Sequence, residues 1–280
     1  MNEDLELARL ILESTNLKDK LIFFEPKPTI TDVPQYLLPA LPGRSKKHSI
    51  TNKKAKFPKK GTLKDLSQRA KALHFFANHE LLAIEMMAAA YLMFPQKTKE
   101  DLLFKKGLIS TLIDEQKHFK LYVERINELG VEFGDFPLGG FFWSFMPKIN
   151  SVESYLASVS LTFEAANLDF AKYYMNLFHE LGDTSSADIM NTIYTDEIVH
   201  VSFGRSHMQL LHSNQKLWDS YIEYLPEPLT PERSKGIEVD IEARVKAGLS
   251  DQFIKNVQTY TDDFPITKRK EWKQNSTESI

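Results

Sequence analysis

Two short motifs in this sequence combine residue types that bind metal ions. Both read Asp-Glu-x-x-His, at residues 114–118 and again at residues 196–200. A glutamate and a histidine three positions apart on a helix share one face, so each motif offers a carboxylate and an imidazole to one metal ion. One such pair is common on solvated helices, but a second copy with the same preceding aspartate is hard to attribute to chance. The repeat therefore predicts a metal site.

Each motif has an upstream glutamate that completes its ligand set. Glu80 precedes the first motif's glutamate by 35 residues (115 − 80), and Glu164 precedes the second's by 33 (197 − 164). The segments 80–85 and 164–169 also align, with an offset of 84 (164 − 80). We interpret the chain as two copies of one helical hairpin. The predicted metal ligands are Glu80, Glu115, His118, Glu164, Glu197 and His200.

The positions of the turns support this ligand set. Residues at one height in an antiparallel hairpin lie symmetrically about its turn. The first pair of glutamates has its midpoint at position 97.5, next to the turn signals Pro95 and Thr98. The second pair has its midpoint at position 180.5, next to Gly182. Both pairs are therefore expected to lie level across their hairpins.

Four carboxylates and two imidazoles are the ligand set of ferritin-like di-iron and di-manganese carboxylate proteins. Oxygen and imidazole ligands suit iron or manganese. We expect two metal ions, with iron as first choice and manganese or a mixed iron–manganese pair as the alternative. The competing interpretation places these residues on solvated helix faces. It fits poorly because Glu80 and Glu164 both lie among apolar neighbours.

Further acidic residues are expected to stand behind the ligands. Glu85 is also a rival of Glu80 for the ligand position. We favour Glu80 because it aligns with Glu164, a glutamate like itself. The aspartate before each motif's glutamate can accept the distal N–H of a ligand histidine and fix its tautomer; a solvated carboxylate is the equal alternative. The four candidates for this supporting role are Glu85, Asp114, Asp169 and Asp196.

Long helices must position these residues. Periodic segments rich in Ala, Leu and Met stand between turn signals. Pro95, Gly130 and Gly182 mark helix ends, and Thr98 and Ser151 are suitable N-caps. The four expected helices run from residue 62 or 67 to 94, from 98 to 130, from 151 to 181, and from 184 or 185 to 212.

Connection lengths indicate the topology. A short turn joins the first expected helix to the second, and another joins the third to the fourth, so each of these pairs forms an antiparallel hairpin. The link 131–150 could reach about 60 Å when extended, enough to cross a bundle. The predicted fold is all-α, a ferritin-like four-helix bundle with a long crossover between its second and third helices. Its expected parts are an N-terminal extension (1–61), the bundle (62–213) and a C-terminal helical extension packed on it (214–280).

The two extensions are expected to be less regular. Residues 1–24 hold one short helix, whereas residues 25–61 contain six prolines and are expected to be largely irregular. Short helices are expected near 218–224 and 238–246, and residues 268–280 are polar and expected to be frayed.

Composition narrows the class of protein. The chain has 280 residues, a net charge of −3 and no cysteine, which excludes disulfides, thiolate zinc sites and cysteine nucleophiles. The first residues are acidic and lack an apolar signal core. The most apolar stretch, 81–94, is too short to span a bilayer. We therefore expect a cytoplasmic protein with no membrane partner.

One basic run interrupts this picture. Eight lysines and arginines fall within residues 44–60. We favour a solvated loop, and a phosphate-bearing partner such as tRNA is the second interpretation. The residues of the run are Arg44, Lys46, Lys47, Lys53, Lys54, Lys56, Lys59 and Lys60.

Three segments carry a family resemblance. They are HELLAIE at 79–85, DEIVHVSFG at 196–204 and EARVKAG at 242–248. In these the sequence resembles the DUF455 group of ferritin-like proteins, and more distantly it is similar to di-iron tRNA hydroxylases. The resemblance implies the six-ligand di-metal bundle and leaves the substrate open.

Two functions remain in competition. The first is an O₂-dependent oxidoreductase or hydroxylase, with O₂ and a small molecule as substrates; a di-iron tRNA hydroxylase is a special case. The second is a non-catalytic, metal-stabilised helical binding module. The sequence indicates no catalytic residue and does not set the oligomeric state, with which a dimer is compatible.

Overall fold

The structure, a computed structural model, describes residues 3–23, 27–31, 35–51 and 56–262. These residues form helices and connecting segments without a strand, apart from an isolated bridge between Ile50 and Leu138. The predicted all-α class is confirmed. Lys53 and Lys54 of the basic run and the terminal residues 268–280 lie outside the described residues. The chain divides into two compact units, Met1–Asn150 and Ser151–Ile280.

The first unit is built on the helical hairpin of α2 (Leu66–Met93) and α3 (Lys99–Glu128). α3 begins with a capping box, because the hydroxyl of Thr98 accepts the backbone N–H of Asp101, whose carboxylate accepts the N–H of Thr98. Gly130 follows α3 with φ of 77°, a conformation that favours glycine. The predicted helix limits are confirmed to within a few residues.

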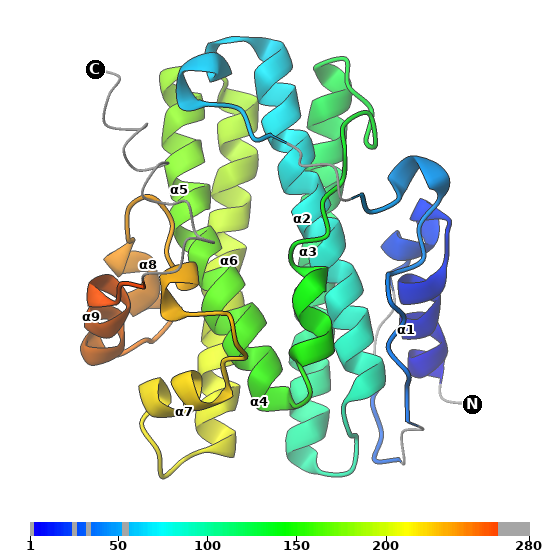
Figure 1. Ribbon diagram of the computed structural model, residues 1–280, viewed down its shortest axis with the longest axis vertical. Helices are drawn as coiled ribbons and strands as arrows, with labels where there is room; N and C mark the ends of the chain where they lie inside the picture. Colours follow the sequence, from blue (N-terminus) through cyan, green and yellow to red (C-terminus); the bar gives the residue numbers. More distant parts are fainter. Residues whose placement is uncertain (1–2, 24–26, 32–34, 52–55, 263–280) are drawn as a thin grey trace. The chain divides into compact units, whose positions relative to one another are not determined.

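α2 is buried on nearly all sides, because neighbouring segments cover more than one of its faces. Ala88, Ala89 and Ala90 are fully buried. Helix α1 (Glu3–Glu13) packs beside α2 and contributes buried Ile11 and Leu12 (Figure 1). A helix that is apolar all round is covered on several sides, which is the situation here.

The irregular segments of the first unit are fastened to the hairpin by side chains. They contain the short 3₁₀ helices η1 (Leu17–Leu21), η2 (Lys46–His48), η3 (Lys60–Lys64) and η4 (Trp143–Lys148). Nε2 of His74 accepts the N–H of Gly134 at 2.9 Å, and the Asn78 amide donates to the Gly139 carbonyl at 2.8 Å. The indole of Trp143 donates to the Ala40 carbonyl at 2.9 Å. The N-terminal segments thus share one compact unit with the first hairpin.

The second unit contains the other hairpin. Its first arm consists of α4 (Val152–Tyr155), the π-helix η5 (Leu156–Glu164) and α5 (Ala165–Glu180), and its second arm is α6 (Thr184–Leu211). The Ser151 N-cap and the turn at Gly182, with φ of 71°, are confirmed. Asp183, which the sequence reading missed, caps α6 by accepting the N–H of Ser186.

The first arm corrects one expectation. We predicted a single regular helix over 151–181, but its middle has the wider π pattern. Hydrophobic periodicity does not reveal this change, because every residue of the segment is buried. Side-chain hydroxyls take part locally: Thr162 donates to the carbonyl of Ala157, five residues earlier, at 2.7 Å.

The tail of the chain adds α7 (Leu217–Tyr224), the 3₁₀ helix η6 (Pro231–Ser234), α8 (Ile241–Lys246) and α9 (Asp251–Thr259). Figure 1 shows α7, α8 and α9 beside the hairpin of α5 and α6. The helix expected from 238 begins only after its N-cap Asp240. α9 was not predicted, although Ser250 caps it and Phe253, Ile254 and Val257 form a buried face.

The two units also bear on the domain division. The N-terminal segments fall in one unit with the α2–α3 hairpin, and the tail helices fall in the other with α5 and α6. The division into 1–61, 62–213 and 214–280 stays a prediction. Among the residues that the structure describes, no helix combines the length and hydropathy needed to cross a membrane.

Candidate metal centre

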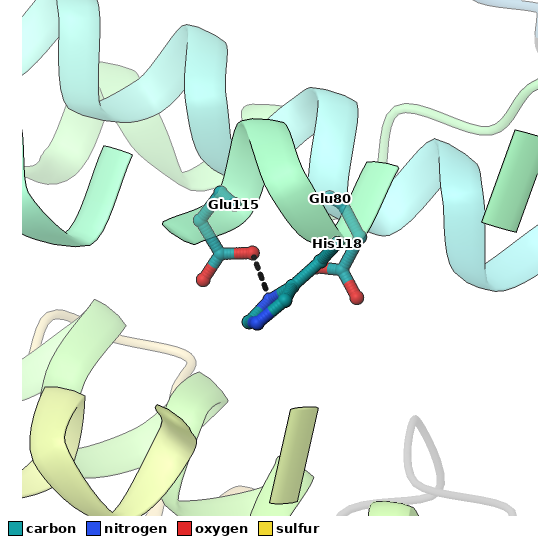
Figure 2. Close-up of side chains that lie close together, drawn as sticks. All are labelled: Glu80, Glu115 and His118. Carbon is teal, nitrogen blue, oxygen red and sulfur yellow. Dashed lines mark hydrogen bonds and ion pairs between the residues drawn. The ribbon is translucent and has the colours of Figure 1, made fainter. Parts of the chain in front are cut away.

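Three of the predicted ligands come together in the first unit. Glu80 comes from α2, and Glu115 and His118 come from α3 (Figure 2). Each offers a ligand atom, and these atoms lie within 4.8 Å of one another. The exposed fractions are 4%, 1% and 0%. Nδ1 of His118 lies 3.4 Å from Oε2 of Glu115.

The local sequence explains this convergence. Glu115 and His118 are three residues apart and therefore share one face of α3. The cap at Thr98 sets where α3 begins after the turn. With that start fixed, Glu80 on α2 and Glu115 on α3 lie level, as their symmetric spacing about the turn predicts.

The second unit holds the corresponding side chains. Glu164 is the last residue of the π-helix, and its carboxylate offers a ligand atom within 4.8 Å of one from His200 on α6. Nδ1 of His200 lies 3.3 Å from Oε2 of Glu197, repeating the contact within the first motif. All three side chains are buried. The sequence reading missed Asn167, whose amide donates to Oε1 of Glu197 at 2.9 Å and fixes that carboxylate.

The donor atoms fit a transition-metal ion. Two atoms bound to one ion at about 2.1 Å each can be at most about 4.2 Å apart. The ligand atoms of the first unit all lie within 4.8 Å of one another, so small side-chain movements of about 0.6 Å or less bring them to binding distance. Buried carboxylates that are ionised need nearby positive charge, which a bound cation supplies. These clusters could hold metal ions.

Glu85, the rival of Glu80, is engaged elsewhere. It is fully buried and accepts hydrogen bonds from Nη2 of Arg44 at 2.6 Å and from Nε at 2.9 Å. Nζ of Lys20 lies 3.3 Å from Oε1 of Glu85, the oxygen that also accepts the Nε–H of Arg44. Two cations thus offset the charge of Glu85, whereas Glu80 lies with Glu115 and His118. This arrangement favours Glu80 as the ligand.

Asp169 has the same kind of partner as Glu85. Arg244 of α8 makes a bidentate pair with it, at 2.5 and 3.0 Å. Its two oxygens also accept the backbone N–H groups of Gly236 and Asp240, each at 2.7 Å. Glu85 and Asp169 occupy matching positions of the repeat, five residues after Glu80 and Glu164. Each therefore ties an extension of the chain to its hairpin through a buried arginine.

The remaining two supporting candidates are only partly buried. Asp114 lies 3.3 Å from the ammonium group of Lys117 on the same helix. Asp196 is half-buried on α6. The expected bond from each aspartate to a ligand histidine of the opposite hairpin stays a prediction.

His79, beside Glu80, is held by aromatic rings. Its ring lies 4.3 Å from that of Phe75 and 4.6 Å from that of Phe142, centroid to centroid. Burial lowers the pKa of His79 to about 4, so the ring is neutral at physiological pH. The residue before Glu80 thus carries no charge at physiological pH.

The basic run offers fewer positive charges to a phosphate-bearing partner than its sequence indicates. Arg44 is buried against Glu85. Lys47 pairs with Glu132 at 2.5 Å. Among the described residues of the run, Lys46, Lys47, Lys56, Lys59 and Lys60 are exposed. The loss of Arg44 to the interior favours the interpretation as a solvated segment over a phosphate-binding surface.

The fold and site define an all-α protein with buried carboxylate–histidine clusters suited to metal ions. Residues 7–255 match the family described as "Protein of unknown function (DUF455)", and the chain belongs to it. The chain is 27% identical over 215 residues to an "Uncharacterized protein" of Haemophilus influenzae, covering 70% of this chain and 74% of the relative. No solved structure matches the chain. The predicted family is confirmed, and the affiliation with ferritin-like proteins stays a prediction.

Proposed function

We propose that this chain is a di-metal carboxylate protein that uses iron to activate O₂ and oxidise or hydroxylate a substrate. In this proposal the two hairpins pair as a ferritin-like four-helix bundle and share one centre. The residues that would hold the two ions are Glu80, Glu115, His118, Glu164, Glu197 and His200. Two bound iron(II) ions would supply two of the four electrons that take O₂ to the oxidation level of water, and the oxidised substrate would supply the other two.

The observation that carries the proposal is the buried cluster of Glu80, Glu115 and His118. Its motif recurs in the second unit with the same histidine–glutamate contact. The formal charges also match. Four ionised glutamates carry −4 and two divalent cations carry +4, so the filled centre has no net charge to bury.

The chain's own residues would control this centre in several ways. The glutamates set the number of oxygen ligands, and each histidine supplies one nitrogen. Asn167 restrains Glu197 through the 2.9 Å hydrogen bond. His79, the sequence neighbour of Glu80, would add no charge beside the centre, because its ring is neutral and packs against Phe75 and Phe142. A small-molecule substrate is the simplest partner for a site with such buried ligands.

The test is iron loading under anaerobic conditions followed by measured O₂ uptake. We expect the wild-type chain to bind two iron ions and then consume O₂, and Glu115→Ala to do neither. Glu124→Ala is the matched control, because Glu124 lies on the same helix but is exposed. A chain that binds iron and never consumes O₂ would favour the metal-stabilised binding module. A chain that binds no transition metal would contradict both functions.

A further inference from the structure

The π-helix η5 marks the point where the two repeats differ. It covers Leu156–Glu164, and the ligand candidate Glu164 is its last residue. The equivalent Glu80 lies within the regular helix α2. π-helical turns are rare and are frequently found at functional sites. The wider turn changes the direction in which the residues that follow it point, so the aim of the Glu164 carboxylate depends on this segment.

Hydroxyl groups stabilise the π segment from within. Ser158 donates to the carbonyl of Ser154 at 2.6 Å. Thr162, two residues before Glu164, donates to the carbonyl of Ala157 at 2.7 Å. Because hydroxyls engage backbone carbonyls here, they compete with the regular α-helical hydrogen bonds of the segment.

The tail of the chain reaches the same hydroxyl. Tyr221 of α7 is fully buried, and its hydroxyl lies 2.8 Å from that of Thr162. The Thr162 hydroxyl thus has two partners, the hydroxyl of Tyr221 and the carbonyl of Ala157. Burial raises the pKa of Tyr221 to about 12, so the phenol keeps its proton under all ordinary conditions. α7 therefore fixes Thr162 in place.

α6 meets the π segment at Gly204. A Cβ atom at this position would lie 2.3 Å from the Cβ of Ser160, closer than two such atoms can approach. Only glycine lets α6 approach so closely. α6 also carries Glu197 and His200, seven and four residues before Gly204. The contact therefore sets the spacing between Glu164's segment and the helix with the other two ligand candidates.

Arg244 of α8 secures the end of the π segment. Its Nη2 donates to the carbonyl of Ala165, the residue after Glu164, at 3.1 Å. The same guanidinium is held by Asp169 and by the Ser234 carbonyl. Arg244 is almost completely buried, so this bond is shielded from water. The change from π to α geometry thus falls at a backbone position that α8 holds.

We propose that Gly204, Tyr221 and Arg244 are positioning residues for Glu164, and that the C-terminal extension serves the metal centre without contributing a ligand. This inference rests on the proposed function. It predicts that metal binding in the second unit depends on side chains that touch no metal.

The experiment titrates the metal-free full chain with Co(II) and records visible absorption, which reports the ligand geometry. We expect Gly204→Ala to weaken Co(II) binding by about 10- to 100-fold and to alter the spectrum, with Tyr221→Phe near the lower end of that range. Far-UV circular dichroism checks folding. Tyr91→Phe is the matched control, because Tyr91 is equally buried and its hydroxyl donates to Asp4 in the first unit.

A complementary pair of substitutions separates positioning from general damage. In Ser160→Gly/Gly204→Ala the clashing Cβ is absent, and the next atom of residue 160, its Cα, is 3.5 Å away. We expect this double variant to recover most of the Co(II) affinity and the wild-type spectrum. If Gly204→Ala does not fold, Tyr221→Phe decides. If the wild type binds Co(II), and Tyr221→Phe and any folded Gly204→Ala bind it with the same affinity and spectrum, the inference is overturned and the proposed function is not. No Co(II) binding by the wild type overturns the proposed function.

Discussion

Glu80 and Glu85 are predicted to respond in opposite ways to the same substitution. Glu85→Gln leaves Arg44 and Lys20 buried with a neutral partner. Removing one member of a buried ion pair costs about 3–5 kcal/mol, and we expect the lower end because the amide oxygen still accepts a hydrogen bond. For a chain of this size, about 3 kcal/mol lowers the melting temperature by about 6–12 °C.

Glu80→Gln instead removes one of two neighbouring buried carboxylates. Without metal this relieves repulsion with Glu115, so the melting temperature of the metal-free chain is expected to stay the same or rise. With metal, the variant is expected to lose the stabilisation that ligand binding gives the wild type.

The assay is thermal unfolding by circular dichroism, with and without added Fe(II) or Co(II), under anaerobic conditions. The two variants should separate completely: Glu85→Gln is less stable but still gains stability from metal, and Glu80→Gln is stable but gains none. The reverse pattern, with metal stabilisation lost only in Glu85→Gln, would show that Glu85 is the ligand and refute the assignment.

Three further predictions concern buried groups and a cap. Burial lowers the pKa of Lys105 to about 8 from 10.5, so between these pH values the unfolded chain binds more protons than the folded chain. The free energy of unfolding therefore rises with pH across that window, and Lys105→Met should flatten this rise in urea titrations. Burial lowers the pKa of His74 to about 4, so the contribution of the neutral ring to the free energy of unfolding is lost as the pH falls from about 6.5 to 4. His74→Gln should lose less stability in acid, because its amide oxygen can still accept the N–H of Gly134 and does not titrate. Thr98→Ala should lower the melting temperature by about 2–4 °C through loss of about 1 kcal/mol of capping energy, and an unchanged value would contradict the role of the capping box.

The parts of the site set by local geometry could be predicted from the sequence. The three-residue spacing of Glu115 and His118 fixes their common helix face. The symmetric placement of Glu80 and Glu115 about the turn fixes their height. Caps such as Thr98 and Ser151 are local as well, which is why the helix limits near them were predicted closely.

The parts set by distant contacts could not be predicted. Glu85 forms buried ion pairs and is not assigned as a ligand, because Arg44 and Lys20, which lie 41 and 65 residues earlier in the sequence, reach it. Neither residue has a periodic relation to the helix. The π-helix likewise has contacts with Gly204 and Tyr221 from other elements, far away in the sequence. Apolar patterning reports burial and not the choice between α and π hydrogen bonds.

The metal content of the purified chain tests the central claim most directly. Protein from cells grown with iron and manganese is analysed by elemental mass spectrometry, alongside His118→Ala, His200→Ala and the exposed control Glu124→Ala. We predict two transition-metal ions per chain in the wild type and the control, and clearly fewer in both histidine variants. A wild-type chain without bound transition metal, or histidine variants that keep both ions, would contradict the account.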